Sequence, residues 1–135
     1  MIRRKAILDK PSRLTAEEYE IMKMHTVYGE RCLKSVPGKL GKLAREIALL
    51  HHEKWDGTGY WGYKASCLPR HISIVSVCDV YCALISSERP YKKPWAADEA
   101  LRFIENQAEK QFCPKVVNAF LTLFEDKKSE ILAAY

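Results

Sequence analysis

The chain has 135 residues, of which 47% are hydrophobic and 29% are charged, and its formal net charge is +5. This length fits one domain, and the apolar content excludes a largely disordered chain. The N-terminal stretch MIRRKAILDK lacks the apolar segment of a signal peptide, and no apolar run approaches the roughly 18 residues of a membrane span. We therefore expect a cytoplasmic protein whose moderate basic excess suits an anionic ligand.

The N-terminal segment up to Leu14 is expected to be extended. Thr15 and Glu18 then match a capping box, in which the Thr15 hydroxyl accepts a hydrogen bond from an amide of the first turn while the Glu18 carboxylate reaches back. This pattern predicts a helix that starts here and runs to about Val36. Pro37 and Gly38 should end it.

Further helices are predicted over residues 41–53, 69–85, 96–109 and 114–135. The segment ISIVSVCDV would also suit a buried strand on propensity alone. We favour a helix because the apolar stretch continues to residue 85, which is too long for a typical strand. The sequence therefore predicts an all-α protein of five or six helices, with Pro69 in a first helical turn.

Histidines and one aspartate carry the most chemistry. His51 and His52 end the predicted helix 41–53 and should point about 100° apart, as ligands of two neighbouring metals would. Asp79 interrupts an apolar stretch, where an unpaired carboxylate is costly and needs a cation or several hydrogen bonds. Simpler roles are equally open at this point: the two histidines interact with a helix dipole, Asp79 holds an Arg in the core, and His25 is a surface residue.

Four segments follow one another in a specific order: LTAEEYEIMKMHTVYGERCL, HHEKWDGTGY, CDVYCALISSERPYKKPW and FCPKVVNAF. This order resembles the HD-GYP family of metal-dependent phosphohydrolases, whose members hydrolyse cyclic di-GMP. The resemblance extends over residues 7–124. It implies an HD-domain-like helical bundle, of which residues 1–135 form the C-terminal portion without the N-terminal helices.

The resemblance also implies a site, although it assigns no catalytic residue. The positions that match metal ligands are His25, His51, His52 and Asp79. The positions that match contacts to the dinucleotide are Tyr60, Arg89 and Lys92. The positions that match the loop motif of the family are Glu53, Asp56, Gly57 and Gly59.

These residue types suit the chemistry that the resemblance implies. Imidazole and carboxylate bind divalent metals. The sequence does not distinguish Fe, Mn, Zn and Mg, and a chain that has lost the site would bind none of them. Arg89 can take a phosphate with a bidentate fork, Lys92 supplies a point charge, and Tyr60 can stack on the ligand. Considered without the other motifs, Arg89 and Lys92 are more simply interpreted as solvated residues of a loop.

The sequence departs from the family pattern at several positions. The His-Asp dyad is absent and would precede residue 1, so a site for two metals about 3.5–4 Å apart is not expected. The substituted positions are Trp61 for a proline, Cys82 and Cys113 for aspartates, and Ser73 for a basic residue. Cys82 and Cys113 remove hydrogen-bond or ion-pair partners, and such partners help to orient metal ligands.

Two functions are therefore open. The chain is a truncated HD-GYP-type cyclic di-GMP phosphodiesterase, which we expect to be weakly active or inactive, or it is a non-catalytic module of bacterial signalling. Such a module would bind cyclic di-GMP, another signalling protein or a second copy of itself. We expect a cyclic dinucleotide as ligand, and neither DNA nor a membrane as partner.

Overall fold

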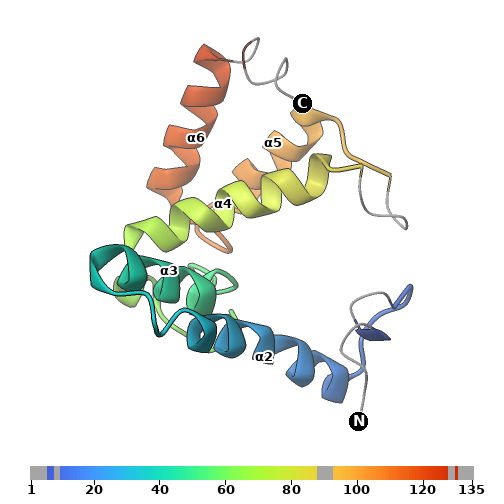
Figure 1. The fold of residues 1–135 in the computed structure, drawn as a ribbon. Coiled ribbons are helices and arrows are strands. Elements are labelled where there is room, and N and C mark those ends of the chain that lie inside the picture. Colours follow the sequence, from blue (N-terminus) through green and yellow to red (C-terminus); the bar gives the residue numbers. More distant parts are fainter. Residues whose placement is uncertain (1–5, 8–9, 88–92, 128–129, 131–135) are drawn as a thin grey trace. The chain divides into compact units, whose positions relative to one another are not determined.

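The computed structural model describes residues 6–7, 10–87, 93–127 and 130 (Figure 1). The helices are α2 (Ala16–Cys32), α3 (Gly38–Leu50), α4 (Arg70–Ile85), α5 (Ala97–Asn106) and α6 (Pro114–Asp126), with a short 3₁₀ turn, η1 (Ala65–Cys67). Within these described ranges there is no β-strand, so the predicted all-α class is confirmed. None of these helices has the length and apolar character needed to cross a membrane. The chain divides into two compact units, Met1–His51 and His52–Tyr135.

The predicted capping box is confirmed at the start of α2. The Thr15 hydroxyl accepts a hydrogen bond from the Glu18 amide at 3.2 Å, and the Glu18 carboxylate accepts one from the Thr15 amide at 2.8 Å. The end of α2 was predicted too late, because the helix stops at Cys32 rather than near Val36. The amides of Leu33 and Lys34 bond to carbonyls three residues back, so the chain forms tight turns between the end of α2 and Pro37.

Predicted boundaries near the N-terminus and in α3 were also wrong by a few residues. Ala6 and Ile7 are helical rather than extended. The second predicted helix, over residues 41–53, is observed as Gly38–Leu50. Gly38 has a φ of 73°, so glycine is the residue that best allows the chain to turn into this helix.

The later helices differ from prediction mainly at their ends. Pro69 is the N-cap of α4 rather than part of its first turn. α5 ends at Asn106 because the chain then turns sharply, which places Glu109 at a φ of 67°. The helical assignment of residues 72–80 is confirmed. The last predicted helix, over residues 114–135, was too long, because α6 ends at Asp126 with Lys127 as its C-cap. Residues 131–135 lie outside the described residues.

The first unit contains a helical hairpin of α2 and α3. A Cβ on Gly29 would lie 3.3 Å from the Cβ of Ala48, so the helices come close together where both side chains are small. Gly41 is also required, because a Cβ there would lie 1.9 Å from the Val36 carbonyl oxygen. The Arg45 guanidinium donates to the same oxygen at 3.1 Å and thereby satisfies a carbonyl of the connecting loop.

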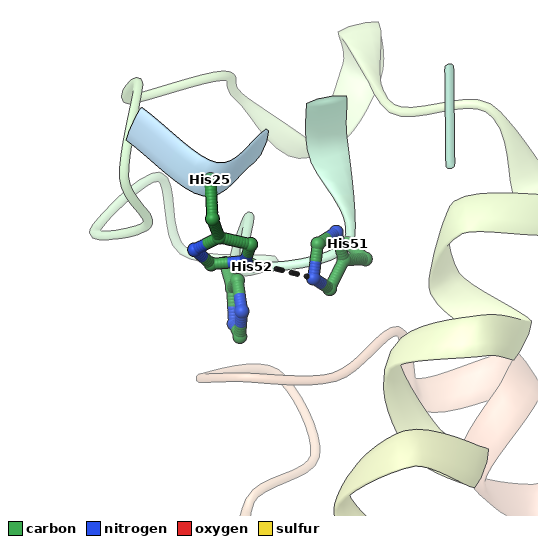
Figure 2. A group of neighbouring side chains, drawn as sticks. All are labelled: His25, His51 and His52. Atoms are coloured by element: carbon green, nitrogen blue, oxygen red, sulfur yellow. Dashed lines mark hydrogen bonds between the residues drawn. The ribbon is translucent and has the colours of Figure 1, made fainter. Parts of the chain in front are cut away.

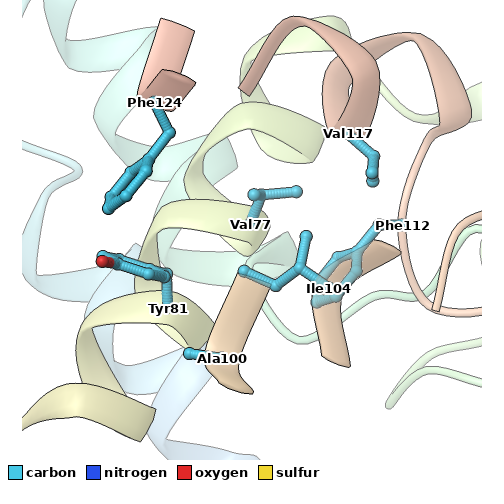
Figure 3. Close-up of a cluster of buried hydrophobic side chains, with 7 residues drawn as sticks. All are labelled: Val77, Tyr81, Ala100, Ile104, Phe112, Val117 and Phe124. Atoms are coloured by element: carbon cyan, nitrogen blue, oxygen red, sulfur yellow. The ribbon is translucent and has the colours of Figure 1, made fainter. Parts of the chain in front are cut away.

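The second unit is organised around one apolar cluster to which α4, α5, α6 and the turn before α6 contribute (Figure 3). Its buried members are Val77, Tyr81, Ala100, Ile104, Phe112, Val117 and Phe124. Tyr81 makes edge-on ring contacts with Phe120 and Phe124, at centroid distances of 5.4 and 5.5 Å. Val77 and Tyr81 are four residues apart, so they fix which side of α4 faces the core.

Candidate functional site

Helix packing in the first unit brings His25 next to His51. His25 lies on α2 one turn before Gly29, and His51 is the C-cap of α3, three residues after Ala48. Because the helices approach closely at Gly29 and Ala48, the two imidazole rings meet, with centroids 5.3 Å apart and planes inclined by 67°. The two residues are 26 positions apart in the sequence, so this meeting is a property of the hairpin.

The backbone sets the tautomer of both rings. Nδ1 of His25 lies 2.6 Å from the Met22 carbonyl oxygen, and Nδ1 of His51 lies 3.0 Å from the Ile47 carbonyl oxygen. A carbonyl oxygen can only accept a hydrogen bond, so each Nδ1 carries the proton and donates it. In the neutral rings the free lone pair is therefore on Nε2. Hydrogen bonds of this kind orient histidines that bind metals.

The two Nε2 atoms face each other at 3.4 Å, which Figure 2 marks with a dashed line. Two nitrogen lone pairs this close can be shared by a single metal ion. A tetrahedral ion with metal–nitrogen bonds of about 2.0–2.1 Å would hold two ligand nitrogens about 3.3–3.4 Å apart. The observed separation fits that edge, so the donor pair suits a divalent metal.

His52 extends the pair, since a peptide bond joins it to His51. One ring nitrogen from each of His25, His51 and His52 lies within 4.8 Å of the others (Figure 2). Three imidazoles suit Zn, Fe, Mn or Ni. The His52 ring also stacks on Tyr60, with centroids 4.6 Å apart and planes inclined by 29°. The expected division of His51 and His52 between two metals remains a prediction.

Asp79 differs from the sequence-based expectation. It was predicted to be enclosed by apolar neighbours, but it is exposed on α4. Val77 and Tyr81 face the core, and Asp79 is two residues from each, about 200° around the helix. The alternative in which Asp79 holds an Arg within the core is therefore wrong. Asp79 is not among the three side chains that meet, and its role as a metal ligand remains a prediction.

Glu53 organises the loop that follows the histidines. It is only 3% exposed, and its two carboxylate oxygens accept hydrogen bonds from the amides of Trp61 at 2.7 Å and Tyr63 at 2.9 Å. The loop is thus tied to the residue directly after His52. A proline at position 61, which the family pattern has, would lack the N–H that makes the shorter bond.

Gly59 and Asp56 shape the same loop. A Cβ on Gly59 would lie 2.5 Å from the Cα of Glu53, so only glycine lets the loop lie against this backbone. Asp56 accepts hydrogen bonds from the Thr58 hydroxyl at 2.7 Å and the Thr58 amide at 2.9 Å, and these bonds hold the pKa of the Asp56 carboxyl below its usual range. Gly57, at a φ of 81°, makes the turn between them. Loop residues near the histidines are therefore fixed in place.

Arg89 and Lys92, the predicted phosphate contacts, lie outside the described residues. Ser73 and Cys113, two departures from the family pattern, line one small cavity together with Glu53. The sequence-based prediction did not include Gly29, which lets α2 and α3 come close together. A signal was present, because each of the two predicted helices has a small residue about one turn from a histidine.

The fold and the site define an all-α domain with a histidine group suited to a divalent metal. The sequence profile of the family described as "HD domain" matches residues 5–116. The chain therefore belongs to the HD domain family, and the resemblance inferred from the order of its motifs is confirmed.

The chain is also similar to known phosphodiesterases. It is 48% identical over 118 residues to a cyclic di-GMP phosphodiesterase of Thermotoga maritima, covering 87% of this chain and 32% of the relative. It is 40% identical to a cyclic di-GMP phosphodiesterase of Vibrio cholerae (89% of this chain, 25% of the relative). It is 36% identical to the 3'3'-cGAMP-specific phosphodiesterase 2 of the same organism (90% and 23%). The chain thus spans a third or less of the length of these relatives.

Metal binding tests the histidine group. Calorimetric titration of the metal-free chain with Mn²⁺ should show a site that His25→Ala and His51→Ala each weaken at least about tenfold, since each removes a ligand nitrogen. His71→Gln is the matched control, because His71 lies on α4 outside the group. Equal Mn²⁺ affinity of His51→Ala and the wild type would refute the assignment.

The loop anchor is tested by Glu53→Gln. Both carboxylate oxygens of Glu53 accept a backbone N–H, whereas a glutamine side chain would present its NH₂ group to one of these two N–H groups. That backbone N–H would then have no acceptor. We expect the free energy of unfolding, measured with urea, to fall by about 1–3 kcal/mol. Glu125→Gln on the exposed side of α6 should change it little. Equal stability of the two variants would contradict this role.

Proposed function

We propose that the chain is the metal- and nucleotide-binding part of an HD-GYP-type cyclic di-GMP phosphodiesterase that acts in the cytoplasm. The observation that carries this proposal is the opposed pair of Nε2 atoms of His25 and His51, whose Nδ1 atoms are both committed to helix carbonyls. The names of the relatives from Thermotoga maritima and Vibrio cholerae support a cyclic dinucleotide as the ligand.

The metal would be held by His25, His51, His52 and, as a fourth ligand, Asp79. A bound divalent metal would supply Lewis-acid activation of water and neutralise charge on phosphoryl oxygens. The protein's own part is to keep the imidazoles in the correct tautomer. The hydrogen bonds from the Nδ1 atoms of His25 and His51 to helix carbonyls do this.

The loop after the histidines would position the dinucleotide. Tyr60 is placed against the His52 ring, so a ligand near the metal would contact the phenol as well. The contacts of Glu53 hold the loop and leave Tyr60 half-buried at its surface. Arg89 and Lys92 are proposed to neutralise the phosphates, in line with the net charge of +5.

A second function, binding without hydrolysis, is favoured by one observation. Ser73 and Cys113 line a cavity beside Glu53, at positions where the family pattern has charged residues. The cavity beside Glu53 therefore lacks two charged neighbours that the family pattern has. We therefore expect hydrolysis, where it occurs, to be slow.

The two functions are separated by incubating the purified chain with cyclic di-GMP and Mn²⁺ or Fe²⁺, with 3'3'-cGAMP as a second substrate. The proposal predicts slow, metal-dependent product formation that His51→Ala abolishes, because this variant removes one of the opposed Nε2 atoms. His71→Gln should keep the wild-type rate. Saturable binding with no turnover would favour the non-catalytic function, and the absence of both would overturn the proposal.

A further inference from the structure

A groove of about 570 Å³ opens on the second unit, and none of the described residues proposed to contact the metal or the dinucleotide lines it. It lies between the start of α4 and the start of α6. Its apolar wall includes Trp55, Leu68 and Val116, and the charged residues in its described lining are Arg70 and Lys115. Both charges are positive, so the groove is basic as well as apolar.

The two helix N-termini at this groove add to its positive character. Neither Pro69, the N-cap of α4, nor Cys113, the N-cap of α6, caps its helix with a side-chain hydrogen bond. The first turns of both helices contain no acidic residue, and instead they carry Arg70 and Lys115. A helix N-terminus has partial positive charge and open amide donors, so cations there are unfavourable unless an anion joins them.

Ser73 is the independent sign of a ligand. It is only 8% exposed, it lines the groove, and its hydroxyl has no hydrogen-bond partner among the described residues. A helical serine commonly donates to the carbonyl four residues back, as Ser76 does to Ile72 at 2.9 Å. Ser73 does not make this bond, so its hydroxyl is available to a group within the groove.

The acidic residue of the adjoining cavity does not oppose an anion strongly. Glu53 lines a smaller cavity that shares Trp55, Ser73 and Cys113 with the groove. Its two carboxylate oxygens already accept backbone amides, whose dipoles offset its charge. Two side-chain cations and two helix N-termini therefore outweigh one compensated carboxylate.

We propose that this groove binds an aromatic phosphomonoester, the chemical class that includes nucleoside monophosphates. The phosphate lies at Arg70, Lys115 and the Ser73 hydroxyl, which all line the groove and supply its charge and donors. The aromatic part lies along the apolar wall beside Trp55, whose indole suits a flat ring. This site is independent of the histidine group and of the proposed phosphodiesterase activity.

Calorimetric titration with phenyl phosphate tests the proposal, with EDTA present so that bound metal plays no part. Phenyl phosphate should bind, and inorganic phosphate and phenol should each bind at least about tenfold more weakly, because each uses one half of the groove. Arg70→Gln and Lys115→Gln should each weaken phenyl phosphate about tenfold or more. Arg102→Gln, an exposed basic residue of α5, and His51→Ala should leave its affinity unchanged.

A further variant tests the groove from its wall. Ala119 is exposed and lines the groove, so Ala119→Glu adds a negative charge there without disturbing the core, and it should abolish binding. The proposal is overturned if phenyl phosphate does not bind, or if Arg70→Gln and Arg102→Gln bind it equally. Inorganic phosphate binding as tightly as phenyl phosphate would overturn the assignment to an aromatic ligand.

Discussion

The close approach of α2 and α3 at Gly29 and Ala48 is the constraint on which the candidate metal site depends. Helices can come this near only where both side chains are small, and one turn beyond the contact stand His25 and His51. The hydrogen bonds from their Nδ1 atoms to helix carbonyls then leave Nε2 as the nitrogen of each ring that carries a lone pair for a metal. Backbone geometry alone thus determines both where the rings meet and which nitrogens they present.

Close backbone contacts also account for the glycines that follow directly after the histidines. Gly59 lies against the backbone of Glu53, where a Cβ would clash, and the buried Glu53 carboxylate holds two amides of the returning chain. The glycine-rich segment is therefore shaped by these contacts rather than left mobile. It places Tyr60 against the ring of His52, which is the first residue of the same unit.

The sequence predicted what local chemistry determines. The capping box at Thr15 needs only two side chains three residues apart, and it was found as expected. The exposure of Asp79 could not be read from its apolar neighbours, because only the packing of α4 on α5 and α6 decides which side of an apolar helix is buried. The roles of Glu53 and the Trp61 amide depend on a loop that returns over eight residues, for which the sequence has no periodic signal.

If the proposed site is correct, Nε2 of His25 and Nε2 of His51 bind the same metal ion. Crystals of the chain grown with Mn²⁺ and measured at the manganese absorption edge test this most directly, because anomalous scattering locates the ion without reference to activity. We expect an anomalous peak within bonding distance of both Nε2 atoms, with both Nδ1 atoms still bonded to the Met22 and Ile47 carbonyls. A peak bonded to Nδ1, or bound manganese elsewhere with these two rings vacant, would contradict the shared site.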